Sequence, residues 1–304
     1  MQTIQLISLR HSAFYTPYLM TFTGNFLSEQ GLKSEYRCVT SVEELENALL
    51  DGSAHVAQSA VGVSMRKLGN HSSQSQKILH FAQINQRDGF FLAASPSIKI
   101  EEKLLQSNGF DWRSLENKRL IADHLFQPMA TLKYVLEKNS VDVSKIEFIN
   151  AGNVDQSIAA FNAGQADYIH LQGPYPQQLA SEGKAIIVAS VGTALGDIAY
   201  SSLCAISSWL ESDMAKQFLR AYQAAMVYVN QTSAAKLAKE LLPLFDSIDI
   251  EILSETIQAY KDLNSWSDSI NISEESFAVA NKVFMFSGDI KSIINYKQVV
   301  FNDL

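Results

Sequence analysis

The fold class is decided by residues 40–59, which read TSVEELENALLDGSAHVAQS. A hydroxyl side chain at the start, followed by glutamates in the next turn, predicts a helix N-terminus, and Asp51 with Gly52 predicts its end. Residues 54–59 then read as a short buried strand. A helix that leads directly into a buried strand is the repeating unit of α/β proteins, so this stretch predicts an α/β fold.

The same alternation continues on both sides of this stretch. Residues 4–9 alternate between apolar and polar side chains as a half-buried strand does, and residues 18–29 have apolar side chains at helical spacing before Gly31. Further strands are expected at residues 34–39, 78–84 and 89–94, with another helix that ends at Lys67. Strands that alternate with helices in this way pair in parallel through right-handed crossovers.

The pattern restarts after residue 94 and predicts a second small sheet. Its strands are expected within residues 114–122 and at 146–149, 168–171 and 185–189, and its helices at 129–139 and 154–163. From Trp209 onward the chain is mostly helical, with helices expected at 212–230, 233–245, 250–263 and 274–287. No Gly/Ser-rich or Pro-rich linker separates the two sets, so we expect two lobes that are joined by strands.

Composition and charge exclude several classes of protein. Of 304 residues, 47% are hydrophobic and 18% are charged, which is enough apolar material for a large buried core. Lys and Arg number 24 against 32 Asp and Glu, and the net charge of −8 argues against a nucleic-acid partner, whose phosphates need cations. No run of about 18 apolar residues occurs, so no membrane-spanning helix is expected.

Two cysteines, Cys38 and Cys204, are too few for a disulfide framework. Neither has a second cysteine or a histidine at the spacing that a zinc site needs. We therefore expect both to be small core residues, and we expect no metal site. The chain also has no Walker loop and no dinucleotide-binding fingerprint, and no cofactor is expected.

Four segments, in order along the chain, carry a resemblance to a known family. Residues 9–32 contain LRHSAFYTPYL and GNFLSEQGL, residues 45–57 read LENALLDGSAHVA, and residues 158–168 read IAAFNAGQADY. The fourth segment is the pair of strands separated by the Gly192 region, with the long helical part that follows. Together they resemble the bacterial solute-binding proteins of the sulfonate, nitrate and thiamine-precursor type, which share their fold with the yeast enzyme that makes the thiamine pyrimidine.

The resemblance implies a two-lobe, type II periplasmic-binding-protein fold. This fold has two small, mostly parallel sheets flanked by helices and joined by two hinge strands. Residues 1–92 and 193–304 would form the first, discontinuous lobe, and residues 93–192 would form the second. The ligand would lie in a cleft between the lobes, at the carboxyl ends of the parallel strands, and hinge closure would bury it.

In the first lobe, the resemblance places ligand contacts after the first strand and at a later strand-to-helix junction. His11 and Ser12 are expected to hydrogen bond to the ligand, with Tyr15 as a wall. Alternatively, His11 is a surface residue and Tyr15 fastens the helix to the sheet. Gln58 and Ser59 stand where a helix N-terminus helps to hold an anionic group, although Ser59 can equally cap that helix.

In the second lobe, two turns supply the candidate contacts. His124 and Gln127 stand where the family has a small Gly/Ser-rich turn, and the bulky His124 indicates a pocket that is shaped by side chains. Gln172 and Tyr175 follow a strand, where the family places a polar contact and an aromatic wall. The alternative at this second turn is a plain tight turn at Gly-Pro.

Two further candidates belong to the first lobe. Asp197 would accept a hydrogen bond from an amine or a ring N–H of the ligand, unless it makes a structural contact between the lobes. Trp266 would cover the cleft by aromatic stacking, unless it is a core residue between helices.

An enzyme on the same fold is the alternative to a binding protein. The yeast-type enzyme has a cofactor lysine at the start of a helix and a histidine one turn later, and this chain has Ser59 and Val63 in those places. Without the lysine, no Schiff base forms there. The first ligand loop has no cysteine nucleophile, and the chain has no Gly-x-Ser-x-Gly elbow. No catalytic residue is therefore assigned, and a binding protein is favoured over an enzyme.

The expected function is the capture of a small organic ligand for the permease of an ABC transporter. The ligand would be pyrimidine-like, a sulfonate or an aromatic acid, and we expect the protein to be a monomer. The alternative is a cytoplasmic enzyme or ligand sensor on the same fold, such as a thiamine-pyrimidine biosynthesis protein. No export signal precedes residues 3–9. A periplasmic location is expected for a mature form whose signal has been removed, and a cytoplasmic one if Met1 is the native start.

Overall fold

The computed structural model describes residues 1–69, 77–99, 109–123, 126–245 and 247–302. The chain divides into two units, Met1–Arg87 with Asp197–Leu304, and Asp88–Gly196. It therefore crosses into the second unit after Arg87 and returns after Gly196. The boundaries expected after residues 92 and 192 fall inside β5 (Phe90–Ala94) and α9 (Val191–Leu195), both of which belong wholly to the second unit.

The sheet of the first unit has the strand order β2-β1-β3-β10-β4. Its strands are β1 (Gln2–Ser8), β2 (Leu32–Cys38), β3 (Val56–Ser59), β4 (Ile78–Asn85) and β10 (Ser201–Ile206). In this sheet β1 pairs in parallel with β2 and β3, with Gln2 opposite Leu32 and Leu6 opposite Val56. Because β10 runs antiparallel to both β3 and β4, it alone points the opposite way in this sheet.

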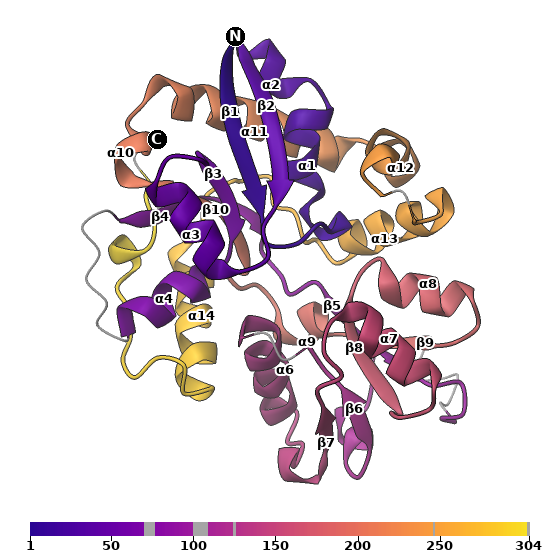
Figure 1. Cartoon of the computed structure of the whole chain (residues 1–304). Helices are drawn as coiled ribbons and strands as arrows, with labels where there is room; N and C mark the ends of the chain where they lie inside the picture. The colour runs from indigo at the N-terminus through magenta and orange to yellow at the C-terminus, as the bar shows by residue number, and fades with distance from the viewer. Residues whose placement is uncertain (70–76, 100–108, 124–125, 246, 303–304) are drawn as a thin grey trace. The chain divides into compact units, whose positions relative to one another are not determined.

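Helices cover both faces of this sheet (Figure 1). On one side lie α1 (Thr16–Thr23), α2 (Phe26–Glu29), α11 (Asp213–Gln231), α12 (Ala234–Leu241) and α13 (Ile250–Asp262). On the other lie α3 (Val42–Leu50), α4 (Val61–Gly69) and α14 (Glu274–Phe286). Shorter elements are α10 (Ser207–Leu210) and the 3-10 helices η1 (Ala13–Tyr15), η4 (Leu242–Leu244) and η5 (Tyr296–Gln298).

The stretch that predicted the fold class forms α3 and β3. Ser41 Oγ accepts a hydrogen bond from the Glu44 N–H at 3.1 Å, and a Glu44 carboxylate oxygen accepts one from the Thr40 N–H at 2.8 Å. The first bond satisfies an N–H group of the first helical turn, which has no partner within the helix, and the second holds the chain just before the N-cap Ser41. The helix ends at Leu50, with Asp51 as its C-cap, and its apolar face packs in a core cluster. The buried residues of this cluster are Ile7, Val39, Leu45, Ala48, Leu49, Ala54, Ala57 and Cys204.

The second unit has its own sheet, with the strand order β7-β6-β8-β5-β9. Besides β5, its strands are β6 (Arg119–Ile121), β7 (Glu147–Ile149), β8 (Tyr168–Gln172) and β9 (Ile186–Ser190). Its helices besides α9 are α6 (Phe126–Lys138), α7 (Val154–Asn162) and α8 (Tyr175–Ser181), with the 3-10 helices η2 (Trp112–Leu115) and η3 (Val143–Lys145). Here β5 is antiparallel to both β8 and β9.

The expected α/β class with two small, mostly parallel sheets and flanking helices is confirmed, with one refinement. Each sheet is mixed, because each contains one reversed strand. The reversed strands, β10 and β5, are the ones that the chain enters immediately after a crossing between units. The direction of a strand in its sheet depends on this long-range path of the chain. The local pattern of apolar residues therefore does not predict which strand is reversed.

Two local expectations were wrong. The helix expected over residues 18–29 is two helices, because Asn25 between them has a left-handed backbone with φ of 65°. Cys38 is exposed, because it ends β2 at the outer edge of the sheet, whereas Cys204 is buried as expected. In the part of the chain that the structure describes, no helix has the length and apolar character to span a membrane.

Candidate functional site

The expected ligand residues of the first unit lie at one edge of its sheet. Because β1 and β3 are parallel neighbours, their last residues, Ser8 and Ser59, are at the same edge. The loop after β1 leads directly into η1 and α1. The fold therefore brings His11 and Ser12 to the edge where Gln58 also lies.

Ser12 and Tyr15 shape this loop. Ser12 Oγ accepts a hydrogen bond from the Phe14 N–H at 3.2 Å, and the Ser12 carbonyl accepts one from the Tyr15 N–H at 3.0 Å. Both side chains are buried, and the rings of Tyr15 and Phe14 are 5.6 Å apart between centroids. Ser12 is thus the N-cap of η1, and Tyr15 packs next to it.

His11 lies half-buried in an aromatic cluster. Its Nδ1 is 3.2 Å from the Tyr36 hydroxyl oxygen, and its ring centroid is 4.6 Å from that of Phe245. Burial lowers the pKa of His11 below its ordinary value, and a hydrogen bond with the backbone of Leu244 opposes this effect. His11 is therefore a neutral imidazole at pH 7, which can both donate and accept a hydrogen bond.

Gln58 ties together the segments that form this edge. Its Oε1 accepts a hydrogen bond from the Leu9 N–H at 3.3 Å, and its Nε2 donates to Ser201 Oγ at 3.0 Å. Ser201 Oγ donates in turn to the carbonyl of Ser59 at 3.2 Å. Ser59 is the last residue of β3, and α4 begins two residues later at Val61. The side chains of Gln58 and Ser201 are buried and, with the Ser59 carbonyl, hold the end of β3 against β10.

Asp197 and Trp266 both have partners within the first unit. Arg87 Nε donates to Asp197 Oδ1 at 2.8 Å, and the Asp197 side chain is 58% exposed. Trp266 is 3% exposed, and its indole N–H donates to the carbonyl of Phe14 at 3.0 Å. The structure thus places Asp197 beside a cation, and Trp266 in the core against the backbone of Phe14.

In the second unit, Gln172 and Tyr175 stand on either side of a cis peptide bond between Gly173 and Pro174. Gln172 is the buried last residue of β8. Tyr175 begins α8 and packs against the apolar cluster under that helix. Gln127 is buried in the first turn of α6. His124 lies outside the described residues.

Sequence reasoning did not point to Asn85 or Ser201, which are both buried at the same edge as Gln58. Asn85 ends β4, and its Nδ2 donates to the Phe14 carbonyl at 2.8 Å. The sequence signal that could have indicated Asn85 is a polar residue at the end of an apolar strand. Ser201 had no comparable signal, because its role depends on hydrogen bonds with residues 142 and 143 positions away.

The start of the second unit holds a buried carboxylate, that of Asp88. Its Oδ1 accepts a hydrogen bond from the Phe90 N–H at 2.7 Å, and its Oδ2 accepts one from Thr131 Oγ1 at 2.5 Å. These two hydrogen bonds fasten α6 to the beginning of β5.

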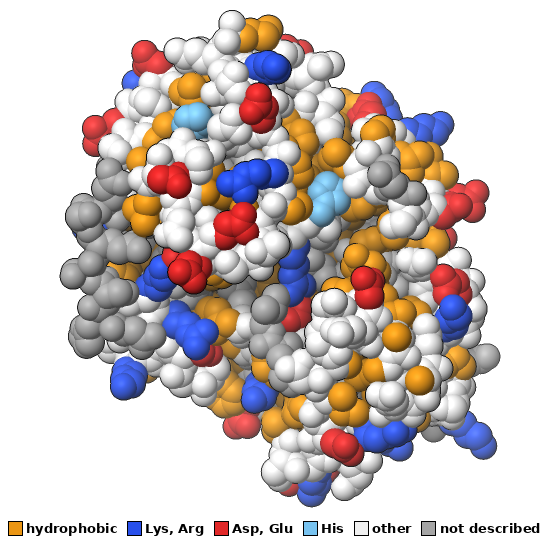
Figure 2. All heavy atoms as spheres, in the orientation of Figure 1, with side chains coloured by type: hydrophobic (Ala, Val, Ile, Leu, Met, Phe, Trp, Pro, Cys, Tyr) orange, Lys and Arg blue, Asp and Glu red, His pale blue; other side chains and the backbone are white. Residues whose placement is uncertain are grey.

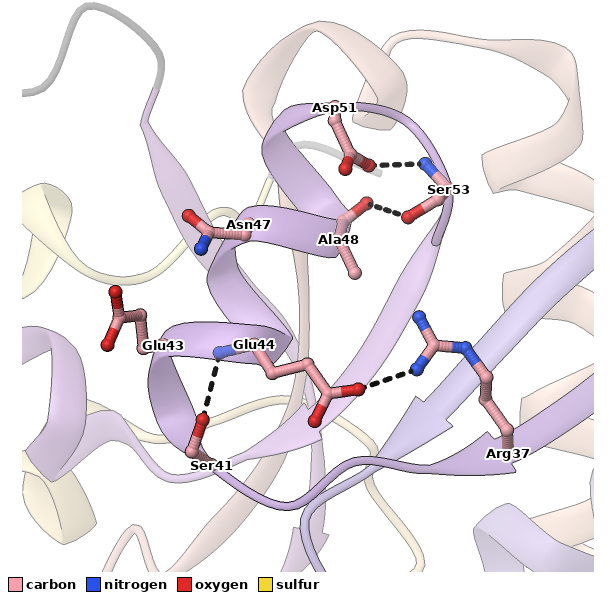
Figure 3. Close-up of a pocket in the computed structure, with 8 residues that line it drawn as sticks. All are labelled: Arg37, Ser41, Glu43, Glu44, Asn47, Ala48, Asp51 and Ser53. Atoms are coloured by element: carbon pink, nitrogen blue, oxygen red, sulfur yellow. Dashed lines mark hydrogen bonds and ion pairs between the residues drawn. The ribbon is translucent and has the colours of Figure 1, made fainter.

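The surface also has a hollow of about 360 Å³ beside α3, lined by residues of that helix together with Arg37 of β2 and Ser53 (Figure 3). Its polar lining includes an ion pair between Arg37 and Glu44 at 3.1 Å and a hydrogen bond from the Ser53 N–H to Asp51 at 2.8 Å. None of the expected ligand residues lines it. We assign no function to it.

Charged side chains of both signs are interspersed over the face drawn in Figure 2. Among residues 1–69, 77–99, 109–123, 126–245 and 247–302, no group of three or more His, Cys, Asp or Glu side chains is arranged to hold a metal ion.

The family model for "NMT1/THI5 like" proteins matches residues 13–233, which is most of the chain. The chain belongs to the NMT1/THI5-like family. A curated relative in this comparison is the Bacillus subtilis (strain 168) protein called "Putative binding protein YtlA", which is 25% identical over 311 residues, covering 99% of this chain and 88% of the relative.

Comparison with solved structures shows which fold this NMT1/THI5-like chain has. The ligand-binding component of an ABC-type import system from Staphylococcus aureus, solved with zinc bound, is similar with a TM-score of 0.77 and 14% identity, over 99% of this chain and 97% of that one. The alkanesulfonate-binding protein SsuA from Xanthomonas axonopodis pv. citri, bound to MOPS, gives 0.74 and 13%, over 99% of both chains. The expected periplasmic-binding-protein fold is confirmed.

Proposed function

We propose that this protein is the solute-binding component of an ABC import system, which captures a small organic solute and delivers it to a membrane permease. The observation that carries the proposal is the family match over residues 13–233 of a chain whose two mixed sheets have the fold of such components. Binding is then the whole chemistry of the protein, and it acts by a shift between open and closed populations.

The proposed solute contacts are the polar and aromatic side chains at the strand ends. In the first unit they are His11, Ser12, Tyr15, Gln58, Ser59 and Asp197, and in the second unit His124, Gln127, Gln172 and Tyr175. Trp266 is not among them, because it is 3% exposed and its indole N–H is bonded to the Phe14 carbonyl. Part of the proposal is that the solute lies between the units and that hinge movement encloses it.

The residue types favour an organic solute over a small inorganic anion. His11 is neutral at pH 7, Ser12 and Gln58 carry no charge, and the carboxylate of Asp197 already faces Arg87. Neutral hydrogen-bonding groups beside aromatic rings suit a flat compound with polar substituents. We therefore propose a pyrimidine-like compound, a sulfonate or an aromatic acid, and an extracytoplasmic location where such a component meets its permease.

The first experiment is mass spectrometry of small molecules released when the purified protein is denatured. A thermal-shift screen of pyrimidines, sulfonates and aromatic acids follows, and each hit is titrated by calorimetry. We expect one class to bind with one solute per chain. Turnover of a compound without stoichiometric binding would instead favour the enzyme alternative.

A matched pair of histidine variants tests the position of the site. His11→Gln changes a residue at the carboxyl-end edge of the sheet and should weaken solute binding at least roughly tenfold, as expected when one buried hydrogen bond is lost. His55→Gln is the control, because His55 precedes β3 at the opposite edge, where its Nδ1 accepts from the Gln5 N–H at 2.9 Å. Equal effects of both variants would move the site elsewhere.

A further inference from the structure

The carbonyl oxygen of Phe14 is the point where three distant parts of the first unit meet. It accepts a hydrogen bond from Asn85 Nδ2 at 2.8 Å and another from Trp266 Nε1 at 3.0 Å. These donors are 71 and 252 residues away in the sequence. Phe14, Asn85 and Trp266 are all buried, so solvent competes little for these bonds.

The local sequence explains why this carbonyl needs outside donors. In η1, the Tyr15 N–H donates to the Ser12 carbonyl and the Thr16 N–H donates to the Ala13 carbonyl. The next bond of this ladder would run from the N–H of residue 17 to Phe14. Residue 17 is Pro17, which has no N–H. A buried carbonyl without a partner is costly, and the two side-chain donors fill both of its lone pairs.

The orientation of the Asn85 amide follows from this contact. A backbone carbonyl only accepts hydrogen bonds, so the Asn85 nitrogen faces Phe14 and the oxygen faces away. That oxygen is buried and, among the residues the structure describes, has no hydrogen-bond partner. Asn85 thus leaves one buried polar atom unsatisfied while its other end holds Phe14. A buried polar atom without a hydrogen bond does not stabilise the fold, so its presence needs another explanation.

The Phe14 ring also packs against neighbouring aromatic rings. Its centroid lies 4.9 Å from that of Tyr260 and 5.8 Å from that of Tyr200, which it meets edge-on. The Trp266 ring in turn lies 6.1 Å from Tyr260. Phe14 is therefore fixed at both its side chain and its main chain, in the middle of the loop that carries His11, Ser12 and Tyr15.

We propose that Trp266 and Asn85 are positioning residues for this loop. They hold the Phe14 carbonyl and thereby fix the backbone of residues 10–15, so that the loop is already arranged when the solute arrives. Trp266 acts through Phe14, from behind the loop. The link to solute affinity rests on the proposed function, whereas the hold on the loop does not.

Amide hydrogen exchange of the solute-free protein tests the hold directly. Trp266→Phe keeps an aromatic ring but removes the N–H, and Asn85→Leu removes the other donor without adding charge. In each variant we expect the amides of residues 14–16 to exchange roughly five- to tenfold faster than in the wild type. Trp209→Phe is the control, because the Trp209 indole N–H has no hydrogen-bond partner in the described chain. It should leave these amides unchanged.

The outcomes separate this inference from the proposed function. Unchanged exchange in both Trp266→Phe and Asn85→Leu, or an equal increase in Trp209→Phe, would overturn the positioning role. Faster exchange in the first two alone supports it, whether or not a solute has been found. With a solute in hand, Trp266→Phe should weaken its binding and Trp209→Phe should not. A wild-type protein that binds none of the screened solutes counts against the proposed function only.

Discussion

Single buried polar side chains determine how the proposed ligand edge is built. Gln58 is 3% exposed, and the hydrogen bonds of both amide ends are made with the protein's own Leu9 and Ser201. A hydrophobic residue of similar size would fill the space but would leave the partly buried Leu9 N–H without this partner, and Ser201 would keep only its bond to the Ser59 carbonyl. The loss then includes the cost of a buried unsatisfied group as well as the bond itself.

Gln58→Leu should therefore lower the free energy of unfolding by about 1–3 kcal/mol. Urea denaturation followed by circular dichroism measures this change. Gln258→Leu is the control, because Gln258 is exposed on α13 and should change the free energy by less than about 0.5 kcal/mol. Similar losses in both variants would show that the Gln58 contacts contribute nothing specific.

A second prediction at the residue scale concerns His80 and the pH dependence of stability. It is fully buried, with Nδ1 2.7 Å from Ser202 Oγ and Nε2 2.9 Å from Ser64 Oγ, and burial lowers its pKa to about 3. Between about pH 6.5 and 3 the unfolded chain binds a proton at His80 that the folded chain does not. The free energy of unfolding should therefore fall as the pH falls, by up to about 1.4 kcal/mol per pH unit.

Urea denaturation at pH 7 and pH 5 checks this effect in the wild type and in His80→Gln. The variant removes the titrating group, so its stability should depend less on pH, whatever its stability at pH 7. Parallel pH dependence in the two proteins would contradict the assignment to His80.

At the scale of elements, Gly196 stands between α9 and the return crossing to the first unit. Its backbone has φ of 84° and ψ of −159°, a conformation that side-chain-bearing residues almost never adopt. A Cβ atom at this position would meet nothing within 4 Å. Substitution there tests backbone conformation without introducing a clash.

Gly196→Ala should lower the free energy of unfolding by about 1–3 kcal/mol through backbone strain. Gly183→Ala is the matched control, since it also has positive φ and open space for a Cβ but follows α8 away from the crossings. We expect a smaller loss there, of about 1–2 kcal/mol, and no effect on solute binding. Thermal and urea denaturation measure both. An unchanged free energy of unfolding in Gly196→Ala would show that the backbone at this crossing adjusts to the side chain without strain.

Local periodicity predicted most elements, because strands and helices of α/β units repeat apolar residues with different periods. It failed at Gly24 and Asn25, where one left-handed residue breaks a helix whose apolar spacing continues. It also did not predict the roles of Asn85 and Ser201, because their hydrogen-bond partners are far away in the sequence. Local sequence specifies elements, but a site assembled from distant segments depends on packing that no single segment encodes.

At the scale of the whole molecule, the two crossings are tied to each other within the first unit. The Ile198 N–H donates to the Gln86 carbonyl at 2.8 Å, and Arg87 pairs with Asp197 at the last residue before one crossing and the first after the other. Asp197 is largely exposed, so the ion pair is worth only about 0.2–1 kcal/mol to stability, and less at high salt.

A double-mutant cycle with Arg87→Ala and Asp197→Ala, followed by urea denaturation, should give a coupling energy within that range. The same variants test how Asp197 is used. If the carboxylate acts through Arg87, both single variants should change solute affinity equally. A loss confined to Asp197→Ala would instead mean that the carboxylate contacts the solute.

We propose that this protein of the NMT1/THI5-like family binds a solute without transforming it. Calorimetric titration with the compound released from the denatured protein tests that claim most directly. We expect saturable binding of one solute per chain, weakened in His11→Gln and unchanged in His55→Gln, with the compound recovered intact. Absence of saturable binding, or recovery of a chemically altered product, would contradict it.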